Sequence, residues 1–146
     1  MNNAAAITLI IFALIYSNNS HANPDRVAYE LQHECRKSAE EYFSKEIGAG
    51  INETDDRIFI TTSENHYNSR LNKCFILIKS KAIYKAPAEK SNSYEDILLQ
   101  ELSENSLYGH YRGYTHSKKS SFCNIRDWKC ESKEQFEKKV KFLMND

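Results

Sequence analysis

A polar segment between two apolar stretches holds the first side chains that could do chemistry. Residues 64–72 read ENHYNSRLN, with His66 two positions after Glu64. An imidazole aided by a carboxylate can act as a general base, the arrangement that a small hydrolase would use. The same composition is typical of an ordered connection whose Asn and Ser side chains satisfy the loop backbone. No partner nucleophile is evident, so we favour the structural interpretation.

A second group lies on an expected strand over residues 107–114. Strand alternation places four side chains on one face: Tyr108, His110, Arg112 and Tyr114. They could offer aromatic stacking and a cation to a glycan, peptide or nucleotide. The alternative is a sheet face covered by its own side chains. Gly109 and Gly113 fall on the other face, where glycine permits close approach of another element.

Four cysteines follow residue 22: Cys35, Cys74, Cys123 and Cys130. In a small exported domain an even number predicts disulfides, here two, with three pairings open. We favour Cys35–Cys74, which would tie the buried stripe of a helix to a central strand, together with Cys123–Cys130. Bridged sulfurs have no thiolate, so a cysteine nucleophile is set aside.

The short Cys123–Cys130 loop encloses Trp128. An indole on a stapled loop is a plausible anchor for a protein contact, and equally a plug for the end of the core. A zinc site would need these two cysteines and a distant histidine such as His110 or His116. Without a C-x-x-C pair that interpretation is weak, so we expect no metal.

Motifs for other chemistry are missing from the sequence. There is no phosphate-binding G-x-x-x-x-G-K-[ST], no G-x-G-x-x-G, no H-E-x-x-H and no G-x-S-x-G. We therefore expect no cofactor. The 20 basic and 20 acidic residues balance. Since nucleic-acid binding rests on a basic face, neutrality argues against a nucleic-acid partner.

The start of the chain has the order of a secretory signal. Residues 1–22 contain no Lys, Arg, Asp or Glu, and an apolar run over 4–16 precedes a polar stretch and the small residues Ser20 and Ala22. The positively charged start is missing. A transmembrane helix would need about 20 apolar residues. We expect export, cleavage after Ala22, and a single mature domain, residues 23–146, without stable membrane insertion.

Two helices are predicted, one at each end of that domain. Asn23-Pro24-Asp25 is a helix start, followed by apolar residues at three- and four-residue spacing until Gly48 and Gly50. Ser132-Lys133-Glu134-Gln135 has the form of a capping box and opens the closing helix.

About four strands are predicted between these helices. Residues 57–62 are rich in β-branched types, and 74–78 form a continuous apolar run expected to be covered on both faces. Residues 97–102 fit either a strand or a helical turn, and 107–114 form the strand described above. This pattern predicts an α+β fold, a small antiparallel sheet with both helices on one face.

A resemblance adds to this interpretation. The residues that carry it are His66-Tyr67-Asn68, Leu71-Asn72-Lys73-Cys74-Phe75, Tyr108-Gly109-x-Tyr111 and Cys123-x6-Cys130-x-Ser132 leading into Phe136. Together, over most of residues 35–146, they resemble small exported proteins of uncharacterised families in Gram-negative bacteria. The resemblance implies an exported bacterial domain with structural cysteines. It implies no activity, because its members lack an assigned one.

These observations predict a non-enzymatic, exported binding module in the bacterial envelope, of inhibitor, immunity or accessory type. Its partner would be another envelope or secreted protein. The candidate binding residues are Tyr108, His110, Arg112, Tyr114, Trp128 and His66. The alternative is a small envelope hydrolase that uses His66 or His110 with an acid such as Glu64. The two hypotheses differ in whether His66 and a carboxylate converge in a concave pocket.

Overall fold

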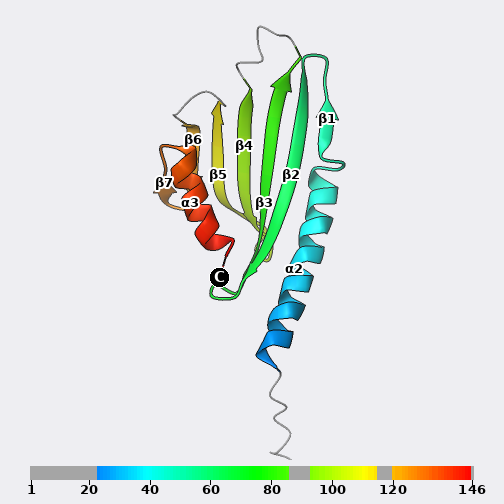
Figure 1. The fold of residues 1–146 in the computed structure, drawn as a ribbon, viewed down its shortest axis with the longest axis vertical. Helices are drawn as coiled ribbons and strands as arrows, with labels where there is room; N and C mark the ends of the chain where they lie inside the picture. Colours follow the sequence, from blue (N-terminus) through cyan, green and yellow to red (C-terminus); the bar gives the residue numbers. More distant parts are fainter. Residues whose placement is uncertain (1–22, 86–92, 115–119, 146) are drawn as a thin grey trace, which may run out of the picture.

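The computed structural model describes residues 23–85, 93–114 and 120–145. Within them, seven strands form one antiparallel sheet, and each strand pairs with its neighbour in sequence (Figure 1). The elements are α2 (Pro24–Glu46), β1 (Ile51–Glu53), β2 (Arg57–Asn68), β3 (Lys73–Tyr84), β4 (Tyr94–Glu101), β5 (Ser106–Tyr114), β6 (Ser120–Ile125), β7 (Trp128–Lys129) and α3 (Lys133–Leu143). The predicted leader, residues 1–22, and His116 lie outside the described residues.

The prediction of about four strands is wrong, because the sheet has seven. β1, β6 and β7 are short and lack the apolar run or strict alternation that signals a strand. The polar residues 63–68, expected to form a loop, continue β2. Their backbone pairs along the whole apolar half of β3, so the ladder orders them whatever their side chains. Residues 97–101 belong to β4, which settles the ambiguity there in favour of a strand.

The predicted first helix is confirmed, together with both of its ends. α2 begins at Pro24, and the side chain of Asn23 accepts a hydrogen bond from the Asp25 backbone N–H at 3.1 Å. At the other end Ile47 is the C-cap, and Gly48 follows with φ of +79°. Glycine adopts that left-handed conformation without strain, so the helix ends there.

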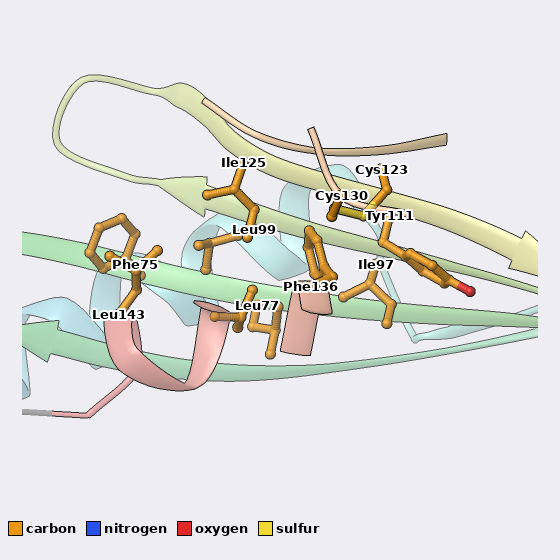
Figure 2. Close-up of a cluster of buried hydrophobic side chains, with 11 residues drawn as sticks. Phe75, Leu77, Ile97, Leu99, Tyr111, Cys123, Ile125, Cys130, Phe136 and Leu143 are labelled. Atoms are coloured by element: carbon orange, nitrogen blue, oxygen red, sulfur yellow. A yellow bond between two sulfur atoms is a disulfide. The ribbon is translucent and has the colours of Figure 1, made fainter. Parts of the chain in front are cut away.

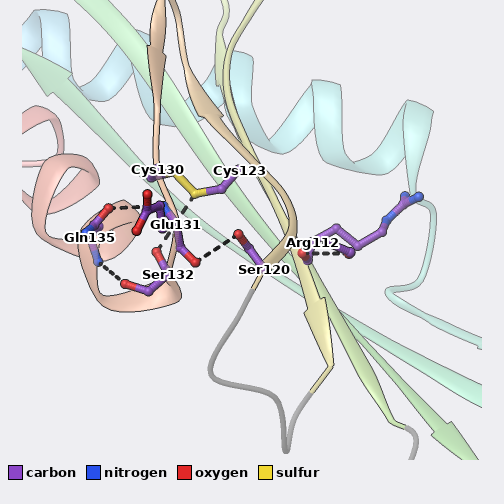
Figure 3. Close-up of a disulfide and its surroundings, with 8 residues drawn as sticks. Arg112, Ser120, Cys123, Cys130, Glu131, Ser132 and Gln135 are labelled. Carbon is purple, nitrogen blue, oxygen red and sulfur yellow. Dashed lines mark hydrogen bonds between the residues drawn. A yellow bond between two sulfur atoms is a disulfide. The ribbon is translucent and has the colours of Figure 1, made fainter.

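The N-cap predicted for the closing helix is confirmed, whereas the return bond of the capping box involves the residue before it, Glu131. The Ser132 Oγ accepts a hydrogen bond from the Gln135 backbone N–H at 3.3 Å. The Gln135 side chain reaches back to accept a hydrogen bond from the Glu131 backbone N–H at 3.1 Å. These reciprocal bonds fix the direction in which the chain enters α3 (Figure 3).

The helices lie on opposite faces of the sheet, which corrects the prediction that both would pack on one. The reason is the continuously apolar run in β3. Ile76 and Ile78 pack with Ala39 of α2, whereas Phe75 and Leu77 belong to the core on the α3 side. Since successive strand residues point to opposite faces, such a run gives each helix an apolar surface.

The larger core lies between the sheet and α3 (Figure 2). Phe136 of α3 is fully buried at its centre, and a Cβ placed on Gly109 would lie 3.3 Å from its ring. Gly109 therefore permits the close approach of another element that was expected on this face of β5. The core consists of Phe75, Leu77, Ile97, Leu99, Tyr111, Cys123, Ile125, Cys130, Phe136, Val140 and Leu143.

Two disulfides are present, in the pairing that the sequence favours. Cys35 of α2 is bonded to Cys74 of β3, with a Cα–Cα distance of 5.4 Å. Cys123 of β6 is bonded to Cys130, three residues before α3 (Figure 3). The first bridge ties the long helix to a central strand, and the second ties the end of the sheet to the start of the short helix.

Candidate functional site

Each helix covers only part of its face, so on both sides part of the sheet is covered by neither of the two described helices. α2 packs on β2 and β3 near one edge, and α3 packs on β5 and β6 near the other (Figure 1). On the α2 side the open part therefore extends over β4, β5 and β6. On the α3 side it extends over β2 and over the part of β3 beyond Leu77, because Phe75 and Leu77 are buried in the core on that side.

The open surface on the α2 side is rich in aromatic and arginine side chains. The register places Tyr94 of β4 directly opposite Tyr114 of β5. Two positions along, Arg112 of β5 lies opposite Phe122 of β6. We call this surface the Tyr–Arg face and define it by Tyr84, Tyr94, Arg112, Tyr114 and Phe122.

The Tyr–Arg face contains a shallow cavity of about 310 Å³, lined by Tyr84, Tyr94, Arg112, Tyr114 and Ser121. Two of its large side chains are well exposed, Tyr114 at 52% and Phe122 at 47%. Exposed aromatic groups gathered on one face, rather than scattered singly, are typical of a binding surface.

Asp96 of β4 organises the polar part of this face. Its Oδ2 accepts a hydrogen bond from Arg112 Nη2 at 2.5 Å, and its Oδ1 lies 2.6 Å from His110 Nε2. The His110 ring in turn packs on Phe122, with 4.8 Å between ring centroids. The hydrogen bond to Asp96 raises the pKa of Arg112 above its ordinary value, so the guanidinium stays charged. One carboxylate therefore fixes both predicted basic residues in place.

A second arginine lies at the β2 end of this surface. Arg57 lies over the Tyr84 ring, 4.7 Å from its centroid, and donates a hydrogen bond to the Tyr84 hydroxyl at 3.3 Å. Arg57 also forms an ion pair with Asp56. Hydrogen bonds from Arg57 and then Thr54 lower the pKa of Asp56 from 3.8 to about 2.

The structure brings together three of the four predicted residues of β5 but not Tyr108. The register between β4 and β5 shifts after Leu99, which places Tyr108 on the α3 side. There its ring packs edge-on against Phe75, at 5.0 Å, and lies under the guanidinium of Arg126 at 4.9 Å. A β-bulge adds one residue to a strand and so reverses the alternation beyond it. Tyr108 is therefore a core-edge residue and not part of the Tyr–Arg face.

Trp128 lies in β7, opposite Ile125, and is 41% exposed. It does not line the cavity of the Tyr–Arg face. Its exposure shows that it is not enclosed in the core, the second of the two roles considered for it.

Three members of the Tyr–Arg face were not predicted from the sequence: Tyr84, Tyr94 and Phe122. A sequence signal for Tyr94, and for Asp96 that holds Arg112, is present in β4. If residues 94–101 are taken as a strand, Tyr94 and Asp96 share one face by alternation. Their pairing with Tyr114 and Arg112 does not follow from the tight connection between β4 and β5, because it depends on the register shift after Leu99. Phe122 stands in a polar hexapeptide that gives no such signal.

The open surface on the α3 side is a trough between the helix and the sheet. Two cavities of about 340 and 350 Å³ share Lys79, Ile97 and Glu137 as lining residues, so they form one trough along α3. We call it the α3 trough. Its sheet side includes Ile60, Leu77 and Ile97, and its helix side includes Glu137, Val140 and Lys141.

His66 lies in this trough rather than in a loop. His66 and Glu64 both point to the α3 side of β2 and line the 340 Å³ cavity. The Glu64 carboxylate is 2.6 Å from Lys79 Nζ, so it is engaged in an ion pair. No Ser, Thr or Cys lines that cavity among the described residues. A hydrolase here would have to activate water directly.

In the described ranges, no three His, Cys, Asp or Glu side chains lie close enough together to hold a metal ion. Neither α2 nor α3 combines the length and the apolar character needed to cross a bilayer. No protein-family model, no curated protein and no solved structure matches this chain.

Proposed function

We propose that the protein is a non-enzymatic, exported binding module that uses the Tyr–Arg face to bind another envelope or secreted protein. The observation that carries the proposal is the open, polar-aromatic half of the sheet, in which Asp96 holds Arg112 on the same face as Tyr114 and Phe122. Tyrosine and arginine are enriched among the residues that dominate protein interfaces.

The fixed geometry of this face supports binding. Arg112 is held by Asp96, His110 packs on Phe122, and the rings of Phe59 and Tyr94 meet edge-on at 6.5 Å. Side chains that are already ordered lose little rotamer entropy when a partner docks. The surface is also close to neutral, because its arginines are each paired with an aspartate. That favours a protein partner over a polyanion.

Two disulfides in a small domain are compatible with an oxidising compartment. Within the envelope, an inhibitor or immunity-type protein would use the Tyr–Arg face to cover a partner's site. An accessory protein would use it to join an assembly. In both roles the face itself makes the contact.

Site-specific photo-crosslinking tests the proposal. A photoreactive phenylalanine analogue in place of Tyr114, in protein expressed with its own leader, should give one discrete adduct with an envelope or secreted protein. The same group in place of Tyr29, which is 72% exposed on α2, is the matched control and should give none. Adding Arg112→Ala to the Tyr114 probe should abolish the adduct. Equal labelling from both positions would refute the Tyr–Arg face as the binding surface.

The hydrolase remains a second candidate because His66 and Glu64 line one cavity. Turnover of ester, peptide or glycan substrates by the mature protein, abolished by His66→Ala in a variant that still folds, would make it the better account. We expect no turnover from either protein.

A further inference from the structure

The aromatic rings of the Tyr–Arg face follow a diagonal line across the sheet. Tyr94 of β4 and Tyr114 of β5 lie directly opposite each other and form a row. Tyr84 of β3 lies two residues beyond the partner of Tyr94 on that strand. Phe122 of β6 lies on the other side of the row, opposite Arg112 and so two residues away from Tyr114. The line therefore has three positions: Tyr84, the Tyr94–Tyr114 pair and Phe122.

The three positions are evenly spaced. Neighbouring strands are about 4.8 Å apart, and two residues span about 6.7 Å of a strand. From Tyr84 to Phe122 the line crosses three strand spacings and the length of four residues, about 20 Å in all, with the Tyr94–Tyr114 pair at its midpoint. Successive positions are therefore about 10 Å apart. A polyproline II helix, which rises about 3.1 Å per residue with three residues per turn, repeats at nearly the same interval, about 9.3 Å.

The polar groups that this face offers to a partner are hydrogen-bond donors. Both carboxylate oxygens of Asp96 are engaged, one by Arg112 and one by His110, and the Asp96 side chain is only 19% exposed. The Arg112 side chain is 52% exposed, and among the described residues it donates to Asp96 alone, from Nη2. The Tyr84 hydroxyl accepts a hydrogen bond from Arg57, which leaves its own proton to donate. A complementary segment is therefore rich in acceptors and poor in donors.

A proline-rich segment has these properties. The carbonyl groups of a partner's helix or strand are used in its own hydrogen bonds, whereas a polyproline II helix has no internal hydrogen bonds and leaves its carbonyls free. Each proline also removes an N–H group. Proline-rich segments dock on surfaces lined by aromatic rings. Since Arg57 and Arg112 are each paired with an aspartate, such a segment needs no acidic residues.

We infer that the Tyr–Arg face recognises a neutral, proline-rich segment of its partner in the polyproline II conformation, with proline at every third position. The inference rests on the proposed function and names the part of the partner that this face binds. The segment runs diagonally from β3 to β6. Its prolines pack on Tyr84, on the Tyr94–Tyr114 pair and on Phe122, and Arg112 donates a hydrogen bond to a carbonyl between the last two.

Three synthetic peptides of about ten residues, long enough for two turns of a polyproline II helix on the line, test the inference on the intact mature protein. The first has proline at every third position and no charged residue. The second has alanine in place of those prolines. The third keeps the prolines and has glutamates between them. Affinity is measured by fluorescence anisotropy, and the contact surface by amide chemical shifts.

We expect the neutral proline peptide to bind and to shift the amides around Tyr84, Tyr94 and Phe122. The alanine peptide should bind at least about tenfold more weakly, because it has no preformed helix. The glutamate peptide should bind no more tightly than the neutral one. Phe122→Ala removes the last position of the line and should weaken binding about tenfold. Trp128→Ala is the matched control, since Trp128 is an aromatic residue of similar exposure outside the line, and it should change little.

Four results would overturn the inference. They are equal affinity for the proline and alanine peptides, tighter binding of the glutamate peptide, shifts confined to another surface, and no binding by any peptide. The photo-crosslinked adduct of the Tyr114 probe separates this inference from the proposed function, because mass spectrometry identifies the partner segment that it contains. Prolines at three-residue spacing in that segment would support the inference. An adduct with a segment that lacks them would refute the inference and leave the proposed function standing.

Discussion

The two helices bury different shares of their length against the sheet. α2 has 23 residues but fully buries only Cys35 and Ala39, and the Cys35–Cys74 bridge ties it to β3. α3 has 11 residues and buries Phe136, Val140 and Leu143 in the larger core. Both helices pack on the sheet and each has a disulfide on it or just before it, but the long helix buries fewer of its residues than the short one. The length of a helix is a poor guide to how firmly it is attached.

This difference extends to the two open surfaces. The side chains of the Tyr–Arg face all stand on strands, and four of them contact neighbouring side chains of the sheet: Arg112 contacts Asp96, Phe122 contacts His110, Tyr84 contacts Arg57 and Tyr94 contacts Phe59. The α3 trough has a helix for one wall, so it exists only while α3 is in place. Damage to α3 should therefore remove the trough and spare the Tyr–Arg face, and the first three predictions below test the contrast between the two helices.

The largest effect is expected for Phe136→Ala. Removing a fully buried ring from the centre of the core should lower the free energy of unfolding by about 3–5 kcal/mol, measured by urea denaturation. Phe142→Ala is the control on the same helix, because Phe142 is 59% exposed and the Arg70 guanidinium lies over its ring. Similar losses for the two variants would mean that α3 is not held by its core.

Next come the two disulfides. Replacing Cys35 and Cys74 by alanine opens a loop with a sequence separation of 39 and should cost about 4 kcal/mol by the chain-entropy relation. Replacing Cys123 and Cys130 opens a loop with a separation of 7 and should cost about 2.5 kcal/mol. The comparison is made by urea unfolding of the two double variants. The reverse order would show that the packing of α2, and not its bridge, holds that helix.

A smaller effect is expected at the helix caps. Ser132→Ala removes the cap of α3 and should cost about 1 kcal/mol, because that helix is part of the core. Asn23→Ala removes the corresponding cap of α2 and should cost less, since residues 23–30 are all exposed and the first turns can fray without disturbing the sheet. Thermal unfolding of the two variants measures both effects. Equal losses of stability for Ser132→Ala and Asn23→Ala would contradict the prediction.

The smallest effect concerns the turn that joins β1 to β2. Because Asp56 has a pKa of about 2 in the folded protein, below its ordinary 3.8, its carboxylate stabilises the fold fully above about pH 4. That contribution is lost as the pH falls from about 4 through about 2. Asp56→Asn should remove this part of the acid sensitivity, seen as a flatter dependence of the urea midpoint on pH. An Asp56 carboxyl that titrates near 3.8 by NMR would contradict the prediction.

The parts of the fold that were predictable are those whose signal is local. Both helices have capping residues and a regular apolar stripe. The apolar run of β3 predicts a buried strand from its own sequence, without reference to the neighbouring strands. The polar half of β2 is ordered by its pairing with β3. No pattern within residues 63–68 predicts that pairing. The short strands at the edges have too few residues to carry an alternation.

The candidate site was only partly predictable for the same reason. Alternation along β5 correctly grouped His110, Arg112 and Tyr114, since these lie on one side of the bulge. It misplaced Tyr108, which lies beyond the bulge, because a register shift depends on the partner strand. Which face of the sheet each helix covers depends on the side of β3 against which it packs. Like the register shift, this is set by tertiary contacts and not by the local sequence.

The two bridges join cysteines that are consecutive along the chain, first with second and third with fourth. In a chain that crosses a membrane from its N-terminus, Cys35 meets Cys74 before either later thiol has emerged. Oxidation in order of arrival then yields the native pairing, and no wrong bridge has to be exchanged. We expect the protein to mature with an oxidant alone, whereas a pairing that skipped a cysteine would call for an isomerase.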